Sequence, residues 1–345
     1  MMVKITWRRV VFALCAVAAL GMAVAWLGLV PIAASSGHWR ITTWFLHWTM
    51  QNSARTYSAI NTPEKVRDDD GLISAAGHFR QACQVCHGAP GVPPSPVMHA
   101  ATPHAPDLAG TAAEYTDREL FWIIRHGIKY TGMPAWPETG RDDEVRRMVS
   151  FVRQLPTMSP QQYRALTQAT EPGPFARCTG CHGTDGLGRG QQDVPVIAGQ
   201  KRDYLLHALR LHAARKSFSA IMQTAVSGMS DPQLQAAADH FAAMPGLKDA
   251  PPVAPHPIVQ NGLPGDQLPA CRNCHTPGRP GPLLEGQRAG YLAERLRAWR
   301  GDETVVDVRK PQDPMAVIAR RIPEDEIDAI ATSLAQGGSA PVKAP

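Results

Sequence analysis

Apolar positions are densest near the N-terminus of the chain. An uncharged stretch from Val10 to Ser36 consists mostly of Val, Leu, Ala and Trp, and three basic residues precede it: Lys4, Arg8 and Arg9. A helix needs about 20 apolar residues to cross a bilayer, whereas the apolar segment of a cleavable signal peptide has about 7–15. The pattern therefore predicts a transmembrane signal-anchor over residues 10–36.

The charges around this stretch predict its orientation. Basic residues flank the cytoplasmic side of membrane spans, so we expect residues 1–9 in the cytoplasm and everything after Ser36 in the periplasm, outside a bacterial inner membrane. Ala33 and Ser35 leave cleavage open as an alternative. Cys15, inside the stretch, is interpreted as a small hydrophobic residue.

Residues 37–69 form a juxtamembrane segment that is rich in aromatic side chains. These are Trp39, Trp44, Phe45, Trp48 and Tyr57. Aromatic residues beside a membrane span usually sit at the level of the lipid headgroups, and we interpret the segment in this way. The alternative is a helix that docks on a membrane partner, with His38 and His47 as contacts.

The rest of the chain repeats one helical pattern three times. Each copy has a middle helix with apolar residues at helical spacing, followed by a final helix with one apolar face. The middle helices are marked by Leu120, Ile124 and Ile128, by Leu205 and Leu209, and by Leu292 and Leu296. The final helices are marked by Val145, Met148, Val149 and Val152, by Leu234, Ala237, Ala238 and Phe241, and by Ile327, Ile330 and Leu334.

Polar residues mark where the helices of the first copy begin. Thr116 and Glu119 predict a capping box at the start of its middle helix. The acidic run Asp142-Asp143-Glu144 opens its final helix, and we interpret these carboxylates as solvated.

A loop of the form Pro-x-(Leu/Ile)-x-Gly precedes each middle helix. The loops begin at Pro106, Pro195 and Pro282, and a glutamine follows the second and third of them, at Gln200 and Gln287. This order of elements predicts an all-α fold with three tandem modules after the N-terminal transmembrane helix. A chain of 345 residues is also too long for one compact core.

Composition separates the modules from their connections. We expect modules at 70–156, 175–247 and 269–336, linkers at 157–174 and 248–268, and a disordered tail at 337–345. The first linker has enough Gln, Ala and Leu for a short helix, while prolines make the second one semi-rigid and extended. With 29 Gly, 31 Pro and only 6% aromatic residues, the chain favours short helices, long ordered loops and an interior filled by something other than aromatic rings.

Six of the seven cysteines lie in three Cys-x-x-Cys-His motifs, the attachment signature of c-type haem. The motifs are Cys83 to His87, Cys178 to His182 and Cys271 to His275, with Cys86, Cys181 and Cys274 as the second cysteines. Two cysteines on one helical turn can form thioethers to the haem vinyl groups, and the adjacent histidine can bind the iron. A redox-active cysteine pair and half of a zinc site are the alternatives. Three occurrences in an exported chain favour three covalently bound haem c groups.

Methionines are the candidates for the sixth iron ligand. Met222 and Met315 lie at the same distance after their motif histidines, and Met133 stands in the loop Gly132-Met133-Pro134. Any methionine can instead fill a core. Met229 is the rival in the second copy, and the rivals in the first copy are Met98, His99, His104 and His126.

These motifs resemble class I cytochrome c domains. The second and third modules together resemble the dihaem cytochrome c4 family in the Pro-Val-Ile-Ala-Gly-Gln element that starts at Pro195, the helix that starts at Tyr204, and Met222. The first module resembles monohaem domains whose distal loop reads Gly-Met-Pro-Ala-Trp-Pro, here residues 132–137. The resemblance implies an all-α fold around haem with His and Met as iron ligands.

The resemblance also implies that a proline carbonyl holds each motif histidine. The prolines would be Pro106, Pro195 and Pro282, and such bonds orient the ring and tune the metal. The third module departs from the pattern, because Thr276 replaces the glycine that follows the other two histidines, and its loop is short. Its edge and its methionine ligand are therefore in doubt.

An iron bound on both faces has no open position, which favours electron transfer. We expect a respiratory electron carrier, not an enzyme by itself, between a quinol-oxidising complex or dehydrogenase and a terminal oxidase or reductase. The alternatives are a cytochrome subunit of a membrane-bound dehydrogenase, and a peroxidase or gas sensor with one five-coordinate haem. The formal charge of +5 comes without a dense basic run, and three haems add about −6 through their propionates, so nucleic acid is not an expected partner. No small-molecule substrate is expected either.

Overall fold

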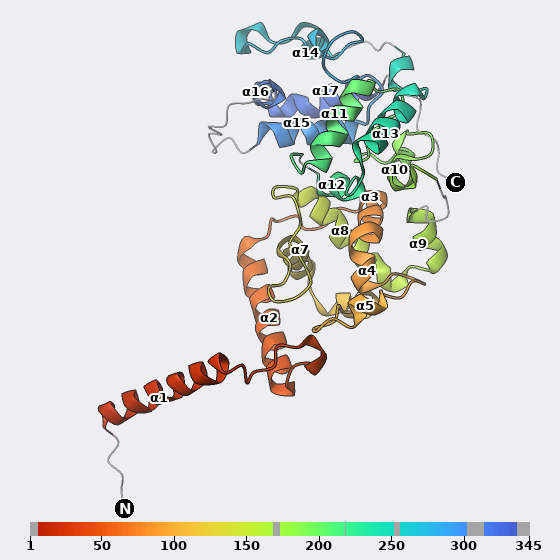
Figure 1. Ribbon diagram of the computed structural model, residues 1–345. Helices are drawn as coiled ribbons and strands as arrows, with labels where there is room; N and C mark the ends of the chain where they lie inside the picture. Colours follow the sequence, from red (N-terminus) through yellow and green to blue (C-terminus); the bar gives the residue numbers. More distant parts are fainter. Residues whose placement is uncertain (1–5, 168–172, 218, 252–255, 302–313, 337–345) are drawn as a thin grey trace, which may run out of the picture.

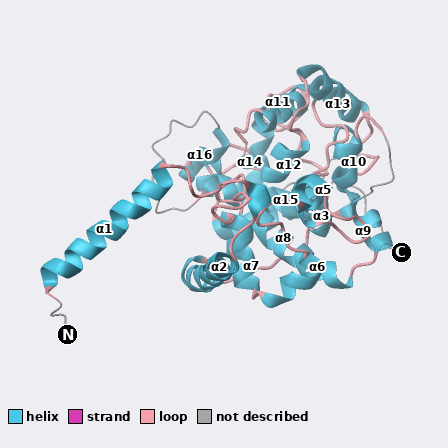
Figure 2. Ribbon diagram, turned by 60° about the horizontal axis from the view of Figure 1, so that its bottom comes forward, coloured by secondary structure: helices cyan, strands magenta, loops and turns pink. Residues whose placement is uncertain are grey.

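The computed structural model describes residues 6–167, 173–217, 219–251, 256–301 and 314–336. Over these ranges the chain folds into helices joined by loops (Figure 2). The β-structure in them consists of two isolated bridges, Ala89 with Val92 and Leu263 with Leu268. The all-α prediction is therefore confirmed. Lys4 and the tail at 337–345 lie outside the described residues.

The helix α1 (Trp7–Trp26) extends away from the helical body (Figure 1). An 18-residue stretch of this helix has a mean hydropathy of 2.0, and none of the residues of α1 is buried. The helix is long and apolar enough to cross a membrane, which is a property shared by membrane anchors and signal sequences. A short turn, η1 (Ala34–Ser36), follows it.

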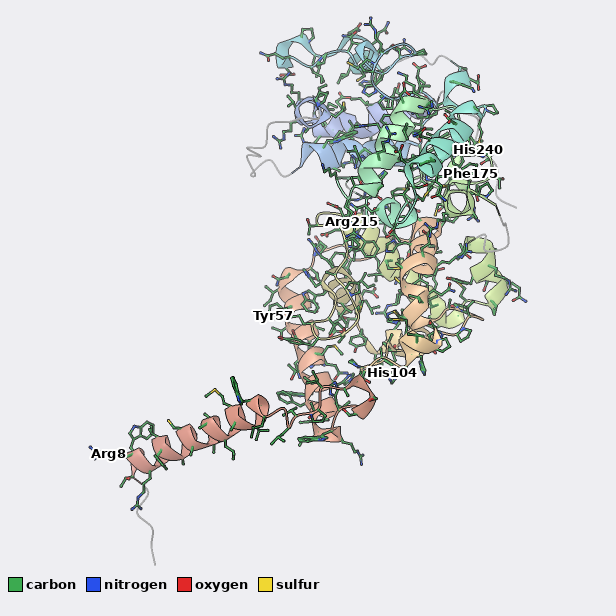
Figure 3. The ribbon with its side chains drawn as sticks, in the orientation of Figure 1. Arg8, Tyr57, His104, Phe175, Arg215 and His240 are labelled. Carbon is green, nitrogen blue, oxygen red and sulfur yellow. The ribbon has the colours of Figure 1, made fainter. Side chains whose placement is uncertain are left out.

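The aromatic juxtamembrane segment folds into the helix α2 (Arg40–Asn61). Its C-terminal half packs against α7 (Asp117–His126), where Ala54 and Ser58 are buried. Tyr57, labelled in Figure 3, stacks on Trp122 with 5.8 Å between the ring centroids. The N-terminal half of α2 keeps its aromatic side chains exposed.

The first core lies among helices of residues 72–167. These are α3 (Leu72–His78), the π-helical turn η2 (Phe79–Cys83), α4 (Gln84–His87), α5 (Pro96–His99), α6 (Leu108–Thr111), η3 (Ala112–Glu114), α7, α8 (Asp142–Gln154), η4 (Leu155–Thr157) and α9 (Pro160–Thr167). Phe79, Phe121, Phe151 and Tyr163 fill this core. The expectation of an interior without aromatic rings is therefore wrong for this part of the chain.

The expected linker 157–174 contains a helix, as its composition suggested, but the helix belongs to the first core. Tyr163 of α9 is 2% exposed and packs against Phe79 and Phe151, at centroid distances of 6.5 and 6.4 Å. One aromatic ring on an otherwise polar segment is enough to dock it, because burying such a ring contributes about 1.5–3 kcal/mol.

The expected faces of the final helices are buried in all three copies, and the capping box of Thr116 and Glu119 is present. Two details differ from the sequence expectations. Ile128 lies beyond α7, because Gly127 (φ +64°) ends that helix. Glu144 is 1% exposed, so its interpretation as a solvated carboxylate is wrong. The contacts from other segments that cover it are described below.

The second and third copies have parallel helical orders. The second contains α10 (Ala176–His182), η5 (Gly188–Gly190), α11 (Arg202–Ala213), α12 (Ala220–Ala225), α13 (Asp231–Ala243) and η6 (Leu247–Asp249). The third contains α14 (Pro257–Asn261), η7 (Pro264–Asp266), η8 (Cys271–Asn273), α15 (Ala289–Arg300), α16 (Pro314–Arg320), η9 (Glu324–Glu326) and α17 (Ile327–Ala335). Met222 and Met315 thus stand on the short helices α12 and α16, between the middle and the final helix of their copies.

The proline-rich segment 248–268 differs from the extended linker that we expected. Ile258 and Val259 on α14 are 6% and 1% exposed, and they pack in the core formed by α15 and α17. Pro257 at the first turn of α14 is compatible with a helix start. Pro257 therefore marks a helix N-terminus, and the part of the segment from Pro257 to Leu268 contributes to the third core.

A buried histidine lies between the first core and its distal loop. His78 on α3 is 4% exposed, its ring lies 4.6 Å from that of Trp136, and its Nδ1 has no hydrogen-bond partner. Burial lowers the pKa of His78 from 6.5 to about 4. The neutral ring therefore stabilises the fold above pH 6.5, and this contribution is lost as the pH falls from 6.5 to 4.

We expect His78→Leu to reduce the acid sensitivity of the protein. The free energy of unfolding of the wild type should fall by up to about 3 kcal/mol more than that of the variant between pH 7 and pH 4. Denaturant titrations of both proteins across this range measure the difference. Equal pH profiles would show that His78 does not titrate in this range.

Candidate haem-binding sites

Each motif histidine forms a hydrogen bond with the proline carbonyl that the family resemblance implied. The Nδ1 atom of His87 lies 2.9 Å from the carbonyl oxygen of Pro106. The Nδ1 atoms of His182 and His275 lie 3.0 Å from the carbonyl oxygens of their own prolines, Pro195 and Pro282. A carbonyl oxygen only accepts, so Nδ1–H donates and Nε2 keeps its lone pair.

The surroundings favour neutral imidazoles at all three positions. Burial lowers the pKa of His87, His182 and His275, and the hydrogen bond to the proline carbonyl opposes this shift. A neutral imidazole with a fixed Nδ1–H is the form that binds a metal through Nε2.

The cysteine pairs stand on two kinds of local structure. Cys86 lies on α4 and follows Cys83 at the end of the π-helical turn, and Cys178 and Cys181 lie on α10. In the third copy the 3₁₀ turn η8 holds the first cysteine, and Cys274 is exposed. The departure that the sequence indicated for the third copy is therefore visible in its backbone.

The electrostatics do not suit a redox-active cysteine pair. Burial raises the pKa of the Cys83 and Cys181 thiols to about 12, and that of Cys178 to about 11. Redox-active thiols have a lowered pKa, because the thiolate is the reactive form. Neutral thiols with a raised pKa, beside a histidine, agree better with thioether attachment.

Half-buried apolar side chains pack against the same cores as the cysteines. In the core of Cys178 they come from the segment before the motif, the proline loop, the middle helix and the distal segment: Phe175, Ile197, Leu209, Met222 and Met229. Figure 3 shows Phe175 beside His240, and the rings stack at 4.3 Å. Cys271 has a similar set that includes Leu284, Tyr291 and Met315. Apolar surface left half exposed beside a histidine and two thiols fits a large flat apolar group such as haem.

The methionines expected as sixth ligands have different settings. Met222 packs against the same core as Cys178, and Met315 packs against the same core as Cys271. Met133 stands in the loop between α7 and α8, where its backbone oxygen accepts a hydrogen bond from the amide of Ile128 at 3.1 Å.

Two of the rival ligands line a cavity together with His87. This cavity of about 560 Å³ is lined by His87, His99, His104 and the neighbours of Pro106 in sequence. The His99 and His104 rings are 5.5 Å apart. Both histidines therefore lie near the first motif.

A pair of glutamines joins the second and third copies in a symmetric arrangement. Gln200 accepts a hydrogen bond from the amide of Leu283 (2.8 Å) and donates one to its carbonyl (3.0 Å). Gln287 makes the same two bonds to Val196, at 2.7 and 3.0 Å. Leu283 and Val196 each follow the proline that holds a motif histidine.

The sequence shows these glutamines at matching positions but does not indicate that they join two modules. The available signal was their matching position after the Pro-x-(Leu/Ile)-x-Gly loop. Lys201, the next residue, adds hydrogen bonds from its Nζ to the carbonyls of Thr276 and Arg279, both at 2.7 Å. The loops that position His182 and His275 are therefore held together directly.

Comparisons with known proteins found a matching family model and several similar proteins. The family model described as cytochrome c oxidase, cbb3-type, subunit III matches residues 72–152. A solved structure of reduced cytochrome c4 from Pseudomonas stutzeri is 25% identical, covers 47% of this chain and 93% of that chain, and has a TM-score of 0.38.

Two relatives match this chain over most of their own lengths. A cytochrome c4 of Pseudomonas aeruginosa is 32% identical over 135 residues, which is 36% of this chain and 67% of the relative. A thiosulfate dehydrogenase electron acceptor of Thiomonas intermedia is 30% identical over 190 residues, which is 51% of this chain and 85% of the relative. With the helical fold and the histidine–proline pairs, these likenesses show that the chain belongs to the cytochrome c family of electron-transfer proteins with covalently bound haem c.

Proposed function

We propose that this chain is a membrane-anchored cytochrome with three haem c groups that passes single electrons between redox partners in the periplasm. The observation that carries the proposal is the threefold repetition of a motif histidine whose Nδ1 lies 2.9–3.0 Å from a proline carbonyl oxygen. A haem bound at each motif supplies the one-electron chemistry, and the chain holds it through two thioethers and an imidazole Nε2.

The sixth ligands in this proposal are Met133, Met222 and Met315. Met222 and Met315 are supported by their packing against the same core as a motif cysteine, and Met133 by its loop, which has the backbone hydrogen bond to Ile128. Met229 packs against the same core as Met222 and is the alternative ligand of the second haem. Substitutions of the two methionines can therefore be compared with each other. Methionine raises the reduction potential and closes the iron to substrates, so the haems carry electrons only.

Intact mass spectrometry of the purified holoprotein tests the number of haems. We expect the polypeptide mass plus three haem groups, retained after denaturation because thioethers are covalent. A mass with two haems, or haem that is lost on denaturation, would contradict the proposal. The same measurement on membrane-extracted protein tests the anchor, since cleavage near Ser36 would remove α1.

Met133→Ala is expected to open one iron to external ligands. The variant should keep three covalent haems, but one of them should become high-spin and bind carbon monoxide, while the wild type stays low-spin. Met98→Ala is the matched control from the same module and should behave as the wild type. If Met133→Ala kept three low-spin signals, the ligand assignment in the first module would be wrong.

A second candidate function is a dedicated cytochrome partner of a dehydrogenase. It is favoured by the relative named a thiosulfate dehydrogenase electron acceptor. In that case the donor is a catalytic polypeptide instead of a quinol-oxidising complex. Co-purification at a fixed ratio with a dehydrogenase subunit supports this second function, whereas rapid reduction by a quinol-oxidising complex, without such a subunit, supports the first.

A further inference from the structure

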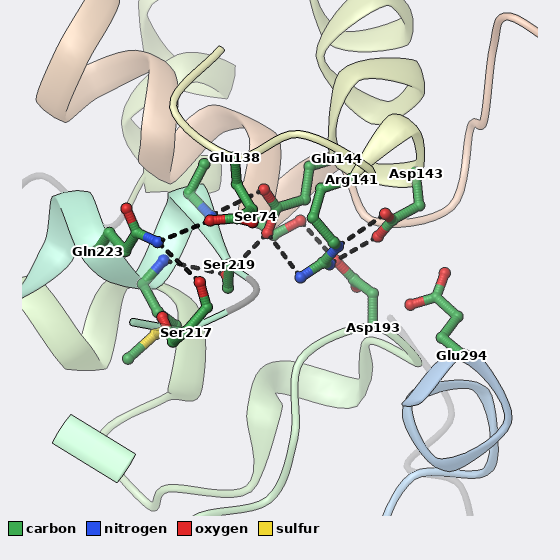
Figure 4. A network of polar contacts seen from close by, with 12 residues as sticks. Ser74, Glu138, Arg141, Asp143, Glu144, Asp193, Ser217, Ser219, Gln223 and Glu294 are labelled. Atoms are coloured by element: carbon green, nitrogen blue, oxygen red, sulfur yellow. Dashed lines mark hydrogen bonds and ion pairs between the residues drawn. The ribbon is translucent and has the colours of Figure 1, made fainter. Parts of the chain in front are cut away.

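A buried carboxylate lies where the first and second modules meet. Glu144, close to the start of α8, is 1% exposed. Figure 4 shows it between Arg141 of its own module and Ser219 at the start of α12. A buried charge requires hydrogen-bond partners to be tolerated, so the groups that donate to Glu144 indicate what it holds together.

One oxygen of Glu144 binds the loop that carries Met133. The Nε1–H of Trp136 donates to Oε2 at 3.1 Å. The backbone amide of Trp136 in turn donates to the carbonyl of Arg125 at 2.9 Å, which ties the loop to α7. Trp136 is three residues after Met133, so the carboxylate anchors the proposed distal loop of the first haem.

The same carboxylate binds the segment that carries Met222. The hydroxyl of Ser219 donates to Oε1 at 2.7 Å, and the amide of Ala220 donates to Oε2 at 3.1 Å. The oxygen of Ser219 accepts a hydrogen bond from the amide of Met222 at 3.2 Å. Only one hydroxyl group therefore separates the Glu144 carboxylate from the backbone of the proposed second distal ligand.

The donors favour the charged form of this carboxylate. Burial raises the pKa of Glu144, and the nearby guanidinium of Arg141, 3.1 Å away, opposes the rise. Two other carboxylates lie in the same network: Asp143 precedes Glu144 on α8, and Glu138 accepts a hydrogen bond from Gln223 of α12. The ring of His78 packs against that of Trp136. With donors on both oxygens, a carboxylic proton would displace one of them.

We propose that Glu144 is a positioning residue that joins the distal segments of the first and second haems and sets their two reduction potentials together. The proposal rests on the proposed function, because it takes Met133 and Met222 as iron ligands. A negative charge held at low dielectric stabilises the oxidised state of nearby irons. Its charge therefore acts on both haems on either side of this contact, and the third haem is an internal reference.

Glu144→Gln in the holoprotein tests the proposal. Spectroelectrochemical titration at pH 7 should show two of the three midpoint potentials rising together and the third unchanged, because the variant loses the negative charge that lies beside both distal segments. Met133→His and Met222→His assign the first and second potentials, since replacing methionine by histidine lowers the potential of the haem concerned.

Glu294→Gln is the matched control. Glu294 also belongs to the charged network in Figure 4, but its carboxylate pairs with Arg147 and touches neither methionine segment. This variant should shift the first and second potentials less than Glu144→Gln does. Ser219→Ala keeps the Glu144 charge and removes the hydroxyl that bonds to both Glu144 and the amide of Met222, so it should shift the second potential and leave the first unchanged.

The outcomes separate this inference from the proposed function. Three low-spin haems with unchanged potentials in Glu144→Gln would overturn the role of Glu144 and leave the trihaem assignment intact. Fewer than three covalent haems in the wild type would overturn the proposed function itself. If Glu144→Gln did not fold, an unchanged second potential in Ser219→Ala would overturn the inference.

Discussion

Arg147→Met is expected to lower the free energy of unfolding by about 3–5 kcal/mol, because it removes a buried cation from three carboxylates. Arg147 on α8 is 3% exposed. It contacts Asp143 of the same helix (3.0 Å), Asp193 of the second module (3.7 Å) and Glu294 on α15 of the third. One side chain thus connects all three expected modules.

The substitution preserves approximate volume and removes the charge, so the loss measures the electrostatic role. Asp193 lies two residues before Pro195 and also accepts a hydrogen bond from Ser74 of α3 at 2.5 Å, so it stays buried when its cation is removed. Denaturant unfolding of the holoprotein, followed by circular dichroism, measures the change.

Arg297→Met is the control for this experiment. Arg297 pairs with Glu324 and Asp328 on the surface, and its side chain is 42% exposed. Exposed ion pairs contribute at most about 1 kcal/mol, so this variant should unfold close to the wild type. Equal midpoints for the two variants would mean that the three-module contact of Arg147 contributes nothing.

The second large effect is expected for the glutamine pair. Gln200→Leu removes both hydrogen bonds to the backbone of Leu283, and Gln287→Leu removes both to Val196. Gln200 and Gln287 are 4% and 5% exposed, so water does not replace the lost partners. The free energy of unfolding of each single variant should be about 2–6 kcal/mol lower than that of the wild type. Each variant leaves two buried backbone groups unpaired, and each such group costs about 1–3 kcal/mol.

Coupling between the two glutamines distinguishes a shared interface from two local effects. If both glutamines stabilise the interface between the second and third modules, the double variant should lose less free energy of unfolding than the two single variants together. The reason is that the first substitution already disrupts the interface on which the second one acts. Calorimetry should then resolve two transitions where the wild type has one. Gln235→Leu, on the outer part of α13, is the control. Strictly additive losses would contradict a shared interface.

Local patterns along the chain were sufficient for the middle and final helices and for the haem-attachment motifs. The faces of α8, α13 and α17 follow helical periodicity, which short-range geometry determines. The three histidine–proline contacts were reached through the family resemblance and the repeat, because each proline follows its motif in sequence. The third motif's altered backbone was likewise signalled by Thr276.

Contacts between distant segments could not be predicted from the sequence. Glu144 belongs to an acidic helix start, so its neighbours in sequence do not indicate burial. It is covered by Trp136 and Ser219, which come from other segments. The proline-rich stretch 248–268 was predicted to be a linker. Two apolar residues, Ile258 and Val259, do not indicate a core by themselves, and only their packing against α15 and α17 shows that they belong to one.

What the sequence alone determined was the repeating unit: the helices, the Cys-x-x-Cys-His motifs and the order of candidate ligands, all of which depend on residues close together in the chain. The tertiary structure alone decided how the units meet, through Arg147, Glu144 and the paired glutamines. The physical reason is that a buried polar group is stable only with its partners in place, and those partners come from other modules.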